Sequence, residues 1–228
     1  MKTKLSRHDP ALVRLEVIAI LAVLALLGAV VLPGLAGGKP RSDAAVCANN
    51  LRQLGMAVLQ YSMEENGMFP PRTSPRWPQQ LLRFYGTIDV LRCPSDGTNP
   101  ATFGTVGADG APRSYLMNGW DDYFEALGLG FAVPNSAMPE SAVVYPAETI
   151  LFGEKTTGSG HWWMDYEIGD DYHELEQSRH GARRGGPTIG GSNYTMVDGS
   201  VRMLRFGESL GPTNMWLVLD AWRIPLGQ

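Results

Sequence analysis

A long apolar stretch near the start of the chain most constrains what this sequence can form. Residues Leu12 to Leu32 read LVRLEVIAILAVLALLGAVVL, and no charged side chain occurs from Val17 to Gly38. A helix that crosses a membrane needs about 20 apolar residues, and a helix of this stretch would be roughly 30 Å long. No similar stretch recurs in the chain. We therefore expect a transmembrane helix over residues 12–32 rather than a soluble core helix.

The short segment before this stretch, residues 1–11, is basic. It reads MKTKLSRHDPA, and its three Lys and Arg side chains outweigh its one Asp. Basic flanks stay on the cytoplasmic side of a membrane, so the C-terminal part is expected on the other side. A cleaved secretory signal is the alternative, with a cut near Gly34–Gly38. The length of the stretch, and Glu16 in its first turn, argue against that alternative.

This N-terminal region resembles that of type IV prepilins and type II secretion pseudopilins. Those proteins have a basic leader, a glutamate as the fifth residue after the cut and a proline as the 22nd. With a cut between Ala11 and Leu12, Glu16 and Pro33 take these two positions. Arg14 stands where the family usually has a small or apolar residue. The resemblance implies cleavage by a prepilin peptidase, N-methylation of Leu12 and an assembly role for the charge of Glu16.

Residues 33–41 predict a kink or linker, because Pro33 removes a helix donor and three glycines follow it. A second helix is expected over 43–66, since apolar side chains recur there at spacings of three and four. The remaining residues, 42–228, have the length of one globular domain. The formal charge of −4 is not that of a nucleic-acid-binding protein.

Three further segments resemble the head of a bacterial pseudopilin-like family. The segment from Cys47 to Pro70 matches C-x-x-N-L-[RK]-Q-[LI]-G followed by N-G-x-[FY]-P, residues 114–118 match S-Y-x-x-N, and residues 193–201 match N-[FY]-x-x-x-D-G-x-V. Relatives place nine residues between a histidine and the Asp-Gly pair. Here His180 and Asp198-Gly199 are separated by 17 residues. The resemblance implies a pilin-like head.

Cys47 and Cys93 are the only cysteines of the chain. Because an exported head would lie in an oxidising compartment, we predict a disulfide between them. Such a bond would close a loop of roughly 47 residues and stabilise the head by a few kcal/mol. Two buried thiols are the alternative.

Strands are expected at 114–118, 142–145 and 149–153, the last ending in Glu154. Asp198-Gly199 predicts a hairpin turn between strands 194–197 and 200–204. A short helix is expected at 77–85, and a loop at 121–138. We expect these strands to form an antiparallel sheet with long loops, on which the second helix packs.

The acidic region after His161 raises the question of a metal. A solvated acidic loop is the favoured interpretation, and calcium binding by Asp165, Glu167, Asp170 and Asp171 is the alternative. The region lacks H-E-x-x-H and EF-hand spacing. No G-x-S-x-G motif occurs either. We therefore predict no cofactor, with calcium as the alternative, and no enzymatic activity.

The predicted fold class is α+β and pilin-like, with a transmembrane helix kinked near Pro33. The predicted function is a structural subunit of a type II secretion or type IV pilus-like filament. Its expected partners are a prepilin peptidase, other pilin subunits and membrane lipid, and its expected location is a bacterial inner membrane with the head outside the cytoplasm. The alternative is a single-pass anchored binding module that does not polymerise.

Overall fold

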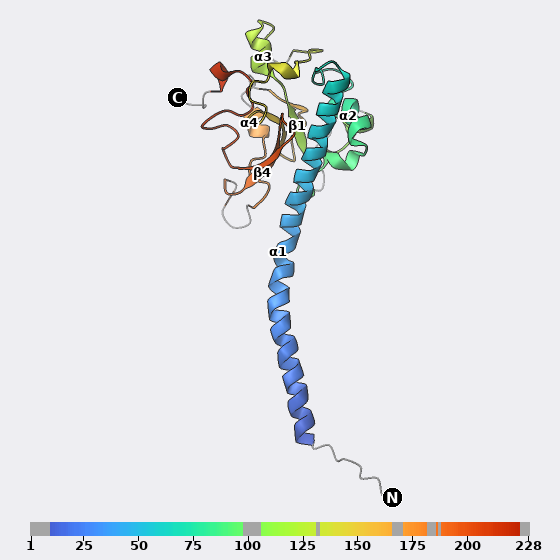
Figure 1. Cartoon of the computed structure of the whole chain (residues 1–228), viewed down its shortest axis with the longest axis vertical. Coiled ribbons are helices and arrows are strands. Elements are labelled where there is room, and N and C mark those ends of the chain that lie inside the picture. Colours follow the sequence, from blue (N-terminus) through green and yellow to red (C-terminus); the bar gives the residue numbers. More distant parts are fainter. Residues whose placement is uncertain are drawn as a thin grey trace, which may run out of the picture. The chain divides into compact units, whose positions relative to one another are not determined.

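The computed structural model describes residues 10–97, 106–130, 133–165, 171–181, 186 and 188–223, without the side chains of 10–16, 28–41 and 171. The chain divides into two compact units, Met1–Arg41 and Ser42–Gln228. The helices are α1 (Pro10–Glu64), α2 (Trp77–Tyr85), α3 (Asp121–Ala126) and α4 (Asp171–Glu174), and the strands are β1 (Tyr115–Asn118), β2 (Ile150–Glu154), β3 (Trp163–Met164), β4 (Gly191–Met196) and β5 (Val201–Arg205) (Figure 1).

The predicted break between two N-terminal helices is wrong. One helix, α1, runs from Pro10 to Glu64 and includes residues 33–41. A proline removes one hydrogen-bond donor, but the bonds of the neighbouring turns remain. Extension of an existing helix adds a hydrogen bond for each further residue, which favours continuation. The kink predicted near Pro33 is therefore not a break in secondary structure.

The predicted membrane span is also contradicted. In the part of the chain that the structure describes, no helix has both the length and the apolar composition that a membrane crossing requires. Apolar side chains of the first unit are described from Val17 to Leu27. These residues extend over roughly 16 Å of helix, about half of the hydrocarbon thickness. The transmembrane helix at 12–32 and the single-pass inner-membrane location are corrected accordingly.

The five strands of the second unit form one sheet in the order β3-β1-β2-β4-β5. The pairs β1–β2, β2–β4 and β4–β5 are antiparallel, whereas β1 and β3 are parallel. The expectation of a wholly antiparallel sheet is therefore wrong. Strand direction explains the difference. Both β1 and β3 run opposite to β2, so the pair that β3 forms with β1 is parallel.

Both faces of the central strands are buried, and their side chains alternate between two cores as strand geometry requires. Tyr115 and Met117 of β1 belong to the core that includes Leu51 and Leu54 of α1. Leu116, between them, belongs to the second core, which includes Trp216. The sheet is thus a middle layer, with α1 residues from 47 onward on one face and the C-terminal segment on the other.

Several predicted elements are confirmed. The helix at 77–85 is α2, and the turn at Asp198-Gly199 joins the antiparallel pair β4 and β5. The strand predicted at 142–145 is wrong: Val144 and Tyr145 are exposed, and Pro146, which follows, cannot donate to a ladder. The segment 121–138, predicted as a loop, begins with helix α3.

A substitution in the centre of β2 tests the second core. A Cβ atom at Gly153 would lie 2.7 Å from the ring of Trp216 and 3.0 Å from the ring of Tyr194. Because both rings are buried, Gly153→Ala should lower the free energy of unfolding by about 1–3 kcal/mol through overpacking. Gly158→Ala is the matched control, since nothing lies within 4 Å of its added carbon. Denaturant unfolding of both variants measures the difference, and equal stabilities would contradict the packing.

Candidate functional site

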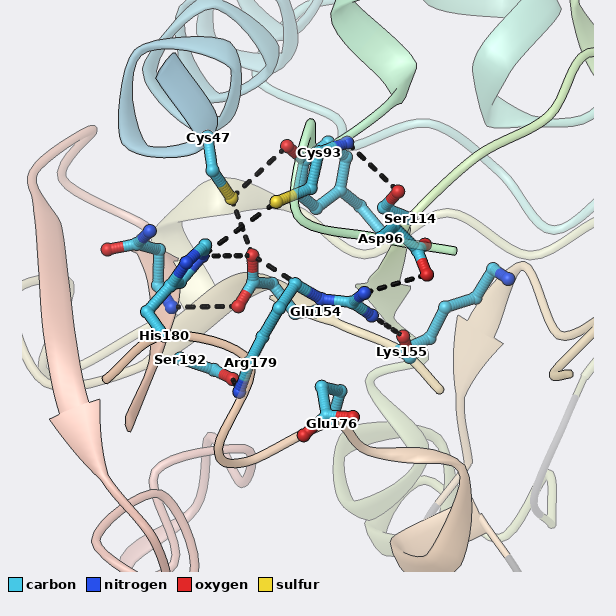
Figure 2. Close-up of polar contacts among 12 residues, drawn as sticks. Cys47, Cys93, Asp96, Ser114, Glu154, Lys155, Glu176, Arg179, His180 and Ser192 are labelled. Atoms are coloured by element: carbon cyan, nitrogen blue, oxygen red, sulfur yellow. Dashed lines mark hydrogen bonds and ion pairs between the residues drawn. The ribbon is translucent and has the colours of Figure 1, made fainter. Parts of the chain in front are cut away.

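Four side chains that could bind a metal converge in the interior of the second unit. Cys47, Cys93, Glu154 and His180 are buried, and their ligand atoms lie within 4.8 Å of one another. We call these four residues the buried cluster. Figure 2 shows that they approach from separate parts of the fold.

Each member is held by a different element. Cys47 lies on α1, on the side that packs on the sheet, and Glu154 ends β2. Cys93 follows the 3-10 helix Ile88–Leu91, and its backbone N–H donates to Ser114 Oγ. His180 is held by two backbone hydrogen bonds to Gly191 at the start of β4.

Glu154 is the centre of the polar contacts. Its Oε1 accepts a hydrogen bond from the Cys47 thiol and lies 3.0 Å from His180 Nε2. Its other oxygen, Oε2, accepts the backbone N–H of Asn193 at 3.2 Å. The Cys93 sulfur lies 3.8 Å from the same His180 nitrogen. Both sulfurs are thus linked to Glu154, one directly and one through His180.

Burial and these contacts shift the pKa values in different directions. Burial raises the pKa of the Cys47 thiol, and the neighbouring Cys93 and Glu154 raise it further. The interaction with Cys47 and then the contact with His180 lower the pKa of Cys93, against the effect of burial. Burial alone would lower the pKa of His180, but Cys93 and Glu154 outweigh it and raise that pKa to about 9. The contacts therefore favour a Cys93 thiolate beside a His180 imidazolium.

A buried ion pair adjoins the cluster. Arg179 Nη1 lies 2.7 Å from Asp96 Oδ1, and its Nε lies 3.8 Å from Glu154 Oε1. Burial alone would raise the pKa of Asp96, but the Arg179 guanidinium and hydrogen bonds from Ser114 and Thr157 lower it overall. Two buried carboxylates thus share one guanidinium.

A local sequence pattern explains how the two cysteines meet. Asn50 is three residues after Cys47, so both lie on the same face of α1. The Asn50 side-chain amide donates to the carbonyl oxygen of Arg92 at 2.8 Å. Arg92 immediately precedes Cys93, so this bond holds the second cysteine against the helix that carries the first.

The cluster has the residue types of a cysteine–histidine–acid triad but not the geometry of one. A triad histidine uses one ring nitrogen for the nucleophile and the other for the acid. Here His180 Nε2 contacts both Cys93 and Glu154. Cys93 is also completely buried. The arrangement is suited to holding a proton, a disulfide or a metal ion in a dry interior.

The structure brings only some of the predicted site residues together. It brings Cys47 and Cys93 together, but as free thiols, so the predicted disulfide is not formed here and the alternative of two buried thiols describes this structure. His180 and Asp198 are not brought together. His180 pairs with Gly191 at the start of β4, whereas Asp198 is exposed in the turn that follows the end of β4. Gly199 adopts a φ of 82°, which the turn requires.

The remaining predicted residues give no site among the described part of the chain. Of the calcium candidates, Asp165 forms an ion pair with Arg72, at 2.8 Å for one oxygen–nitrogen contact. Glu167 and Asp170 lie outside the described residues, as does the side chain of Asp171. The side chains of the predicted N-terminal site residues, Ala11, Leu12, Glu16 and Pro33, also lie outside the described part.

The sequence analysis placed Glu154 only at the end of a predicted strand and did not single out Arg179. Two signals were available. Glu154 is a charged residue at the end of an apolar segment, and such a charge needs a partner when it is buried. Arg179 is adjacent to His180, which the resemblance already marked.

Comparisons with family models, with curated proteins and with solved structures find no match to this chain. The interpretation of the buried cluster therefore depends on its own geometry and chemistry.

Substitution of Asp96 tests the buried ion pair. Asp96→Asn removes one partner and leaves Arg179 buried, so the free energy of unfolding at pH 7 should fall by about 3–5 kcal/mol. The folded-state pKa of Asp96 lies below its unfolded value. Its contribution is therefore complete above an unfolded pKa of about 3.9 and is lost as the pH falls through the folded value.

Denaturant unfolding at neutral and acidic pH measures this effect. The difference between the wild type and Asp96→Asn should shrink below about pH 4. Asp89→Asn changes an exposed aspartate and should alter stability by no more than about 0.5 kcal/mol. A difference for Asp96→Asn that stays constant with pH would show that packing, not charge, is responsible.

Proposed function

We propose that this chain is a structural subunit that assembles with further copies of itself through the first part of α1, in the manner of a pilin or pseudopilin. The observation that carries the proposal is the exposure of residues 17–27. Every described side chain in this range is exposed, and none is polar. Exposed fractions include 65% for Ile18 and 68% for Leu26.

The distribution of these side chains indicates what kind of contact would cover them. Successive helix residues are rotated by about 100°, so an uninterrupted apolar stretch of this length faces every direction. A helix that is apolar on all sides is stable when it is surrounded rather than covered on one side. A single partner helix would leave most of this surface in water.

Further copies of the chain provide such surroundings, because each copy carries the same apolar helix. A helix packed among several equivalent helices makes head-to-tail contacts, which generate open filaments when the rotation does not close. The resemblance to pilins and pseudopilins supports the finer proposal, a type II secretion or type IV pilus-like filament.

Two substitutions on α1 test self-assembly. Leu24 is 58% exposed within the apolar stretch, and Met63 is 75% exposed on the second unit's part of the same helix. Loss of one buried leucine contact should weaken association by about 1.5–3 kcal/mol, or roughly 10–100-fold. We expect Leu24→Glu to reduce assembly by this factor and Met63→Glu to leave it unchanged.

Sedimentation velocity and negative-stain electron microscopy of the full chain measure assembly. The proposal predicts large wild-type assemblies in detergent-free buffer. A monomeric wild type that instead sediments with phospholipid vesicles would overturn it, as would equal effects of the two substitutions.

The resemblance also leads us to propose processing at Ala11–Leu12, with Glu16 as the charge that pairs with the new Leu12 amine of a neighbouring copy. Mass spectrometry of the N-terminus should find a mature chain that begins with N-methylated Leu12 in cells that contain a prepilin peptidase. Glu16→Gln should preserve this cleavage and abolish assembly, because the amine is mostly protonated below its pKa of about 8 and loses its partner. An intact Ala11–Leu12 bond in such cells would contradict the processing step.

A further inference from the structure

We propose that the buried cluster is a binding site for one Zn²⁺ ion, which joins four segments of the second unit. The donor set consists of two cysteine sulfurs, one imidazole nitrogen and one carboxylate oxygen, all within 4.8 Å of one another. Zinc takes four such ligands in a tetrahedral arrangement. Thiolate and imidazole ligands favour zinc over calcium or magnesium, which prefer oxygen.

The two donor distances from His180 are close to those around a central zinc ion. Zinc bonds of about 2.0–2.3 Å at tetrahedral angles place neighbouring ligand atoms roughly 3.3–3.8 Å apart. His180 Nε2 lies 3.0 Å from Glu154 Oε1 and 3.8 Å from the Cys93 sulfur. These two pairs need shifts of only a few tenths of an ångström, whereas the Cys47 sulfur and Glu154 Oε1, 2.5 Å apart, must separate by about 1 Å to admit the ion.

Neighbouring groups orient the donors, as outer-shell partners do in zinc sites. The Tyr115 hydroxyl donates to the Cys47 sulfur at 3.3 Å. The Asn193 backbone N–H holds Glu154 Oε2, which leaves Oε1 directed at the sulfurs and His180. These contacts orient Cys47 and Glu154, whose ligand atoms lie close to those of Cys93 and His180 in Figure 2.

The environment indicates a structural rather than a catalytic metal. All four ligands come from the protein and all are buried, whereas a catalytic zinc keeps a position open for water or substrate. His180 also lines a cavity of about 560 Å³ together with Ile189 and Met203. This cavity provides an approach to the imidazole side of the cluster.

Cobalt titration of the reduced, metal-free full chain tests the proposal. One equivalent of Co²⁺ should bind, with a thiolate-to-cobalt charge-transfer band and intense visible bands of tetrahedral cobalt, and Zn²⁺ should displace it. Ca²⁺ should not compete. Absence of saturable binding, or cobalt spectra without the thiolate band, would overturn the site.

Two ligand variants and one control locate the ion. Cys93→Ser and His180→Ala should each weaken zinc binding by more than the roughly 10–100-fold that loss of an outer-shell partner costs. His173→Ala removes an exposed histidine outside the cluster and should bind zinc as the wild type does. Unchanged affinity of folded Cys93→Ser or His180→Ala, as judged by circular dichroism, would contradict the assignment.

A second measurement requires no substitution. Bound Zn²⁺ should protect both thiols of the wild type from alkylation under mildly denaturing conditions, and mass spectrometry counts the modified cysteines. Equal alkylation with and without Zn²⁺ would place any bound metal elsewhere and overturn the proposal.

Discussion

A charged carboxylate with no exposed surface lies at the end of the central strand β2, and the surrounding structure depends on its neutralisation. Glu154 is completely buried, and an isolated charge in such a place is far more costly than a hydrogen-bonded, paired one. Its partners are the Cys47 thiol, His180 and Arg179, and the Asn193 backbone N–H. The partners come from three separate parts of the chain: α1, the adjacent pair Arg179 and His180, and β4.

This requirement joins segments that are distant in sequence. Glu154 and Cys47 are 107 positions apart, yet their side chains share a hydrogen bond. Asn50 fixes the segment before Cys93 against the same helix, and His180 is tied to β4 through its backbone. The helix, the loop of Cys93, the sheet and the bridge at His180 therefore meet at one polar centre. A metal ion or a sulfur–sulfur bond at this point would strengthen a junction that hydrogen bonds and ion pairs already define.

The two ends of α1 meet different requirements. From Cys47 to Val58 its buried side chains pack on the sheet of the second unit, and the stripe of apolar residues has helical spacing. From Val17 to Leu27 every side chain is exposed and apolar. The part from Cys47 to Val58 packs within its own unit, whereas the described side chains from Val17 to Leu27 are exposed and therefore carry the proposal of self-assembly.

Local periodicity determined much of the secondary structure from sequence alone. The stripe from Val46 to Tyr61 predicted a helix, and Asp198-Gly199 predicted the β4–β5 hairpin, because both signals act between near neighbours. Tertiary structure alone decided that β3 adds to β1 in parallel. It also decided that Glu154 and Arg179 join the cysteines and His180. Those outcomes depend on strand order and on the cost of a buried charge, which act between residues that sequence spacing does not place together.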